Sequence, residues 1–173
     1  MPTIKFNFNR EKAIESILYI SNRVHNTDRI TILKLLYLAD KISLERWGRF
    51  IAGDTYCAIK HGPVGSETYD LIKDNSTLTD QSFKTFGNHV KPQREANIDV
   101  LSESDTECLD KVIAKFGNWH TWDVRDATHD AAYNRIWRAS GEQGSTPIPV
   151  EAIIEQFAEA KDLLDYLENA HSD

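Results

Sequence analysis

The stretch of sequence that decides the fold is ADKISLERWGRFIAGDTYCAIKHGPVGSETYDLI, residues 39–72. An apolar helix runs into this stretch and ends at Gly48, because glycine is the usual residue just beyond a helix. Residues 55–59 then have the aromatic and apolar composition of a short strand. A polar turn follows, and after it a second helix begins. The stretch therefore predicts a helix, a short strand and another helix in close succession.

The helix that ends before Gly48 begins near Arg29, behind the capping residues 26–28. Its apolar side chains face nearly every direction. They are Ile30, Ile32, Leu33, Leu35, Leu36, Tyr37, Leu38, Ala39, Ile42 and Leu44. A helix that is apolar all round is buried in the core of a domain. We therefore expect residues 29–47 to form the central helix of the fold.

The rest of the chain predicts further helices around this one. Apolar residues recur at helical spacing over residues 11–24, 63–73, 101–116 and 119–130, in a further turn at 133–137, and from Pro149 to Leu167. Gly87-Asn88 has the composition of a two-residue hairpin turn between residues 83–86 and 89–91. We expect a mainly α fold: a compact helical domain around a buried central helix, with a small β-hairpin or short-strand element.

A chain of 173 residues is long enough to bury one hydrophobic core. No internal repeat and no low-complexity segment divides the sequence. The boundaries that we assign are an N-terminal extension over residues 1–10, a single domain over residues 11–167 and a C-terminal tail over residues 168–173.

Charge and cysteine content argue against several classes of protein. The formal net charge is −7 at pH 7 and no basic run is visible, so direct binding of nucleic acid is disfavoured. No stretch approaches the roughly eighteen apolar residues that span a bilayer, and the first residues lack the apolar core of a signal peptide. Cys57 and Cys108 are isolated, which argues against a disulfide framework or a zinc knuckle. We expect a cytoplasmic protein with reduced thiols and no membrane contact.

Asp40 is the first candidate site residue. Helical spacing places it on the same face as Leu36 and Leu44, so its carboxylate leaves the central helix among apolar side chains. A buried carboxylate is costly without a partner. The structural interpretation gives it a nearby basic residue, or the free N–H groups at the start of the helix after Gly62, whose positive end favours a carboxylate. The functional alternative is a catalytic carboxylate.

His61 is the second candidate: a general base, a metal ligand, or a residue whose ring fixes the loop. His129 shares a predicted helical face with Asp126 and Asp130, but no further ligand accompanies them at metal-site spacing. The sequence also has no Gly-x-Ser-x-Gly motif and no phosphate-binding glycine loop. We therefore assign no catalytic residue, no metal and no cofactor. The alternative is a metal-assisted hydrolase that uses Asp40, Asp54, His61 or His129.

Tryptophans form a third group of candidates. Trp119 and Trp122 lie three residues apart, and Tyr133 and Trp137 follow. Packing in the core is one interpretation. In an acidic chain that also carries arginines such as Arg49, a protein–protein hot spot is the other. The sequence alone leaves both interpretations open.

Read together, these pieces resemble the Panacea domain, the family of SocA-like antitoxins. The resemblance covers about residues 11–167. The residues that carry it are, in order, Lys34-Leu35-Leu36-Tyr37 with Asp40, Gly53-Asp54 with Tyr56 and Ala58, His61-Gly62-Pro63-Val64 with Tyr69-Asp70, and Thr128-His129 followed by Trp137. Residues 77–97 match only weakly, which makes them a place where an unusual partner could be recognised.

The resemblance implies a mainly helical antitoxin of bacterial or prophage origin that neutralises a cognate toxin by direct protein–protein binding. One member of the family acts instead as an adaptor that delivers its toxin to the ClpXP protease, which makes ClpXP a second partner to consider. Some members carry an additional DNA-binding domain, and we expect none before Glu11.

Within this resemblance, residues 61–64 are interpreted as a structural joint rather than an active site. Such a joint would hold neighbouring tyrosines in fixed places, as a recognition surface requires. We assign partner binding to Arg49, Tyr56, Tyr69, Trp119 and Trp122. We assign the structural motif to Asp40, His61, Gly62, Pro63, His129 and Trp137.

Overall fold

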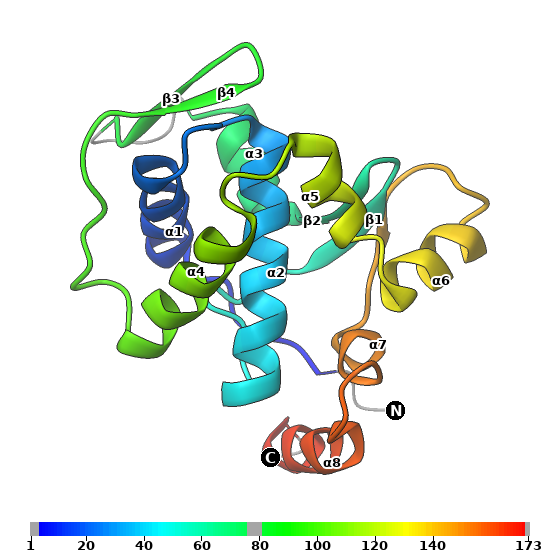
Figure 1. The fold of residues 1–173 in the computed structure, drawn as a ribbon. Helices are drawn as coiled ribbons and strands as arrows, with labels where there is room; N and C mark the ends of the chain where they lie inside the picture. Colours follow the sequence, from blue (N-terminus) through cyan, green and yellow to red (C-terminus); the bar gives the residue numbers. More distant parts are fainter. Residues whose placement is uncertain (1–3, 76–80, 172–173) are drawn as a thin grey trace.

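A computed structural model describes residues 4–75 and 81–171, and these residues form eight helices and five short strands (Figure 1). The helices are α1 (Arg10–Arg23), α2 (Arg29–Trp47), α3 (Ser66–Lys73), α4 (Glu103–Phe116), α5 (Thr121–Ala127), α6 (Ala131–Ala139), α7 (Val150–Ile154) and α8 (Ala160–His171). The strands are β1 (Tyr56–Ile59), β2 (Gly62–Gly65), β3 (Phe83–Phe86), β4 (His89–Pro92) and β5 (Thr146–Pro147). The prediction of a mainly α fold with small β elements is confirmed.

The predicted central helix, α2, is confirmed at both ends. Asp28 is its N-cap and accepts a hydrogen bond from the Ile30 N–H at 2.8 Å. Gly48 is its C-cap and has a φ of 71°, a left-handed conformation that favours glycine. In Figure 1 the helix runs through the middle of the molecule, with the other helices around it.

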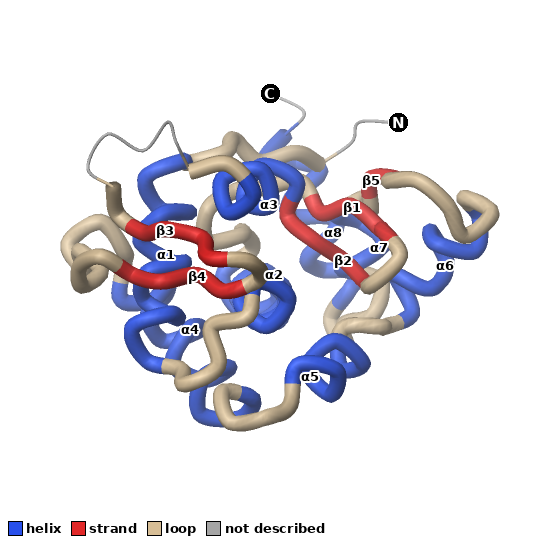
Figure 2. The backbone as a smooth tube through the Cα atoms, turned by 90° about the horizontal axis from the view of Figure 1, so that it is seen from above, coloured by secondary structure: helices blue, strands red, loops and turns tan. Residues whose placement is uncertain are grey.

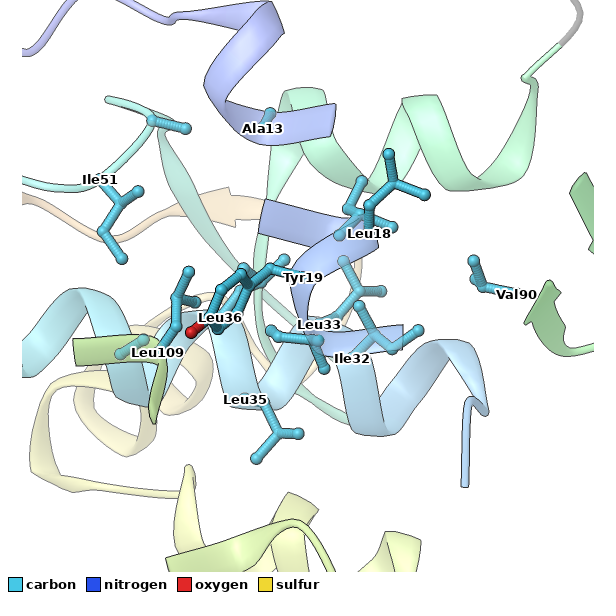
Figure 3. Close-up of a cluster of buried hydrophobic side chains, with 14 of the residues drawn as sticks. Ala13, Leu18, Tyr19, Ile32, Leu33, Leu35, Leu36, Ile51, Val90 and Leu109 are labelled. Atoms are coloured by element: carbon cyan, nitrogen blue, oxygen red, sulfur yellow. The ribbon is translucent and has the colours of Figure 1, made fainter. Parts of the chain in front are cut away.

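Two hydrophobic cores meet at α2. The first core packs α2 against α1, α4 and the β3–β4 hairpin, through residues such as Leu18, Leu36 and Leu109 (Figure 3). The second packs the same helix against β1, α6, α7 and α8, and Tyr37 and Leu44 are its members from α2. Because α2 supplies side chains to both cores, nearly all of its surface had to be apolar.

The second helix of the deciding stretch begins later than predicted. Gly62 and Pro63 lie in strand β2, which pairs antiparallel with β1 so that Pro63 faces Ala58. The sheet order is β2-β1-β5, and an edge strand tolerates a proline because the missing N–H leaves only one side of the ladder incomplete. Helix α3 therefore starts at Ser66. The two-residue strand β5 was not predicted.

The predicted hairpin is confirmed as β3 and β4, paired from Phe83–Pro92 to Phe86–His89. Figure 2 shows it beside α1 and separate from the β2-β1-β5 sheet. Val90 of β4 is fully buried, and its N–H donates to the Thr27 carbonyl at 2.9 Å. The hairpin is thereby fixed to the start of α2. Part of the weakly matching segment, residues 77–80, lies outside the described residues.

The C-terminal third differs most from the prediction. The helix expected over residues 119–130 is α5 and ends at Ala127, and the expected turn at 133–137 is the longer α6. The single helix expected after Pro149 is two helices, α7 and α8. Residues 155–159 between them contain no glycine and no proline. The break therefore has no local breaker, and tertiary packing of both helices on the second core accompanies it.

Both ends of the described chain pack on the domain. Ile4 is buried, and its N–H donates to Glu151 at 2.7 Å. Asn9 caps α1 by accepting from the Lys12 N–H at 3.0 Å. Helix α8 continues to His171, whose ring contacts the Lys5 carbonyl at 2.9 Å. Among the described residues, no helix is both long and apolar enough to cross a bilayer.

Candidate binding surface

Two buried carboxyl groups shape the joint between α2 and α3. Asp54 receives the Glu67 and Thr68 N–H groups at 3.0 and 2.9 Å, so it caps the N-terminus of α3. Gly65, the backbone N-cap, has no side chain, and a Cβ there would lie 2.4 Å from the Asp54 carboxylate. The expectation that a carboxylate occupies this positive helix end holds, but the residue is Asp54 and not Asp40.

Asp40 is buried as predicted, at 5% exposure, and its partners are neutral. Its Oδ1 accepts from the Ile51 N–H at 2.7 Å, and its Oδ2 bonds the Tyr56 hydroxyl at 2.5 Å. Burial raises the pKa of Asp40 to about 7, although both hydrogen bonds lower it. Asp40 thus ties α2 to residue 51 and to β1, without the basic partner that we had expected.

Tyr56 is therefore a core residue, 3% exposed, with its hydroxyl committed to Asp40. A partner cannot reach this side chain, so the assignment of Tyr56 to partner binding is withdrawn. Tyr69 is half-buried and packs against the first core. Arg49 donates to Asp105 at 3.0 Å and to Ser104 at 2.8 Å, so its guanidinium holds the start of α4.

Lys34 is a buried cation that sequence reasoning did not single out as a site. It is 1% exposed, and its Nζ donates to the Pro63 carbonyl at 2.7 Å. Burial lowers its pKa to about 7, with a further lowering from Arg125. A signal was available, because a helix that is apolar on nearly every side leaves no solvent face for a lysine.

The joint residues meet around Gly62, whose φ is 112°. A Cβ there would lie 3.1 Å from both Lys34 Nζ and His129 Nε2. His129 stacks on Tyr133 with ring centroids 4.7 Å apart, and Tyr133 stacks on Trp137 at 6.2 Å. His129 Nε2 is buried and has no hydrogen-bond partner among the described residues. Burial also lowers the pKa of His129, which favours the neutral form of its ring.

The Trp119 and Trp122 side chains are on the surface, 41% and 44% exposed, so this pair does not pack in the core. Trp122 lies against His61 at 5.8 Å between ring centroids, and the Arg125 guanidinium is 4.8 Å from its ring. Trp119 packs edge-on against Phe116 at 4.7 Å. We call these five residues, His61, Phe116, Trp119, Trp122 and Arg125, the aromatic surface.

The four residues of the enzyme alternative lie in two places. Asp40 and Asp54 line one small internal cavity. His61 lies at the tip of the β1–β2 hairpin, and His129, from the loop between α5 and α6, approaches the hairpin at Gly62. Burial lowers the pKa of each. Within the described part of the chain, no group of three or more His, Cys, Asp or Glu side chains is arranged to hold a metal ion.

A family model described as antitoxin SocA-like, Panacea domain, matches residues 32–135. The matched range runs from α2 into α6, so it contains the Asp40–Tyr56 bond, the Asp54 cap, the joint at Gly62 and the whole aromatic surface. No curated protein and no solved structure matches the chain. The family model covers more than half of the sequence, and the chain belongs to the Panacea-domain family of SocA-like antitoxins.

Proposed function

We propose that this protein is the antitoxin of a bacterial toxin–antitoxin pair and neutralises its cognate toxin in the cytoplasm by binding it directly. The observation that carries the proposal is the exposure of Trp119 and Trp122 on one short segment. Tryptophan is enriched among the residues that supply most of the binding energy of protein interfaces. Family membership supplies the kind of partner.

The aromatic surface is also held in place before any partner arrives. Trp122 contacts both His61 and Arg125, and His61 lies in the turn of the β1–β2 hairpin. Trp119 rests on Phe116 at the end of α4. Side chains that are already ordered lose less conformational entropy on binding, which favours a tight complex.

The contacts of the two buried carboxyl groups favour this proposal over the hydrolase. Asp40 is bonded by Ile51 and Tyr56, and Asp54 is bonded by the backbone at the start of α3. Each bond has a structural role, in joining α2 to β1 or in capping α3. Both side chains are also 5% exposed, away from a substrate in solution.

The test is co-expression with a candidate toxin gene taken from beside the gene for this chain. We expect the toxin to arrest growth alone, to be harmless with this protein, and to co-purify with it as a stable complex. An interface of roughly 1,600 Å² in total is the expected size. Neutralisation that requires ClpXP and gives no stable complex would support the adaptor mechanism and contradict direct inhibition. Toxicity unchanged by co-expression would contradict the antitoxin assignment for that pair.

A further inference from the structure

One stripe of α2 is left uncovered by the rest of the fold. Leu38 and Ile42 are only half-buried, although their neighbours Ala39 and Leu35 are fully buried. The two residues are four apart, so they lie on one face of the helix. This stripe of an otherwise largely buried helix is therefore partly open to solvent.

The uncovered stripe is the floor of an open groove of about 600 Å³. From α2, the groove is lined by Leu38, Lys41, Ile42 and Glu45, which have the spacing of a single helical face. The rest of the lining comes from Lys111, Val112, Lys115 and Phe116 of α4 and from Gln156 and Phe157. Figure 1 shows α4 on one side of α2 and α7, which precedes residues 156–157, on the other.

Three of the four charged side chains that line the groove are lysines, in a protein whose net charge is −7. The four are Lys41, Lys111, Lys115 and Glu45. Lys41 pairs with Asp130 at 2.9 Å, and Lys111 approaches Glu107 at 3.3 Å. Among the described residues Lys115 has no ion pair, and its ammonium lies 5.1 Å from the Phe116 ring. An apolar floor with these lysines is complementary to apolar side chains flanked by carboxylates.

The groove is continuous with the aromatic surface. Phe116 lines the groove and belongs to that surface, where its ring contacts Trp119. A partner seated in the groove would therefore extend onto Trp119. A groove lined by two helices and carrying apolar side chains is the kind of site in which an amphipathic helix buries its apolar face.

We propose that this groove binds an amphipathic helix of the toxin, whose apolar face covers Leu38 and Ile42 and whose flanking residues are aspartate or glutamate. The proposal rests on the proposed function for the identity of the partner. The occupant itself is defined by its chemistry, so the groove can be tested without the toxin.

The test uses two labelled helical peptides that share leucines at positions i, i+3, i+4 and i+7, one flanked by glutamates and the other by lysines. Fluorescence anisotropy with the full chain should show the glutamate peptide binding about tenfold or more tightly than the lysine peptide. Ile42→Asp should abolish binding of the glutamate peptide, because it places a charge on the groove floor. Ala114→Asp is the matched control: it adds the same charge at an exposed position of α4 that does not line the groove.

A charge exchange makes the test specific. The double variant Lys111→Glu with Lys115→Glu should reverse the preference and bind the lysine peptide more tightly. Failure of both peptides to bind, or equal binding of both, would overturn the proposal. So would a wild-type dimer that Ile42→Asp converts to a monomer in sedimentation, because the occupant would then be a second copy of this chain.

The toxin assay separates this inference from the proposed function. Loss of neutralisation in Ile42→Asp, with Ala114→Asp unchanged, is expected if both hold. If the Ile42→Asp variant still neutralises the toxin, the proposal that the groove binds a toxin helix is contradicted, and the antitoxin assignment is unaffected. A groove that binds the glutamate peptide in a protein that neutralises no toxin would instead refute only the proposed function.

Discussion

Asp40 is a carboxyl group whose surroundings favour its neutral form. It is bonded by two uncharged donors, Ile51 N–H and the Tyr56 hydroxyl, and burial raises its pKa to about 7. In the unfolded chain the same group ionises near its ordinary value of 3.8. Between these two values the folded state binds more protons than the unfolded state, so stability falls as the pH rises. Above about pH 7 both states are ionised and this dependence ends.

Asp40→Asn should remove this dependence, because asparagine is uncharged at every pH and keeps an oxygen for the Ile51 N–H. The unfolding free energy of the variant should therefore improve relative to wild type as the pH rises from 4 to 7. A pKa displaced from 3.8 to about 7 corresponds to a gain on the order of 4 kcal/mol. Urea denaturation at several pH values measures the difference, and a difference independent of pH would show that Asp40 is ionised throughout.

Asp40→Ala is the companion variant. It leaves two buried donors without an acceptor, at roughly 1–3 kcal/mol each, so it should destabilise the protein at every pH. Comparing the two variants thus separates two contributions of Asp40 to the unfolding free energy: that of its buried charge and that of its two hydrogen bonds. A fully stable Asp40→Ala protein that no longer binds toxin would instead make Asp40 a functional residue.

Sequence periodicity was enough to predict that Asp40 is buried, but not to predict its partners. Tyr56 is sixteen residues away, and only the return of β1 along α2 brings its hydroxyl to the carboxyl group. The same periodicity applied to Lys34 predicts a buried cation. Its partner, the Pro63 carbonyl, follows from the hairpin and not from any local pattern.

Among the elements, the start of α3 depends on a close fit between Gly65 and Asp54. Gly65 has an ordinary φ of −69°, so an alanine there would not strain the backbone. Its Cβ would nevertheless lie 2.4 Å from the Asp54 Oδ2 that accepts the Thr68 N–H. The methyl group and the capping carboxylate cannot both keep their places.

A double-mutant cycle in Gly65→Ala and Asp54→Ala tests this fit. Asp54→Ala should cost about 1–2 kcal/mol of unfolding free energy through loss of the cap. Gly65→Ala should be destabilising in wild type and nearly neutral once the carboxylate is gone. The expected coupling is therefore about 0.5–3 kcal/mol, measured by urea denaturation of the four proteins. Additive costs would mean that Gly65 is required for another reason.

The helix bounds that were predicted wrongly, at the start of α3 and between α7 and α8, have one cause. Gly62-Pro63 has the local signature of a helix start, yet tertiary pairing with β1 makes it an edge strand. Residues 155–159 have no breaker, yet the chain turns there between two helices that pack on the second core. Where local signals and tertiary packing agreed, as in α2 and the β3–β4 hairpin, the bounds were predicted within one residue.

For the whole molecule, the position of α2 between two cores decides which side chains remain for a partner. The aromatic residues assigned from the sequence divide accordingly. Tyr56 is buried in the second core, whereas Trp119 and Trp122 lie outside both. No local pattern in the sequence separates these exposed tryptophans from buried aromatic residues, because both tryptophans have the spacing of a helical face. Within α5 it is Val124, and not Trp122, that is buried, and Trp119 lies just before this helix.

The last prediction separates the surface from the scaffold. Trp119→Ala and Trp122→Ala remove side chains that are already 41% and 44% exposed, so the melting temperature should change little. If they are hot-spot residues, each should weaken toxin binding by about 2 kcal/mol or more. Arg49→Ala should behave differently, because it removes the Arg49 bonds to Asp105 and Ser104 at the start of α4. It should lower the melting temperature, and binding should weaken only as far as folding does.

Trp47→Ala is the matched control, since Trp47 is 51% exposed at the end of α2 and belongs neither to the aromatic surface nor to the groove. Thermal melts and toxin binding should be measured on all four variants. Loss of stability in both Trp119→Ala and Trp122→Ala would assign these rings to the scaffold. Equal loss of binding in Trp47→Ala would show that the interface lies elsewhere on the molecule. Binding lost only in the two surface variants, with unchanged melting, is the result that a preformed recognition surface requires.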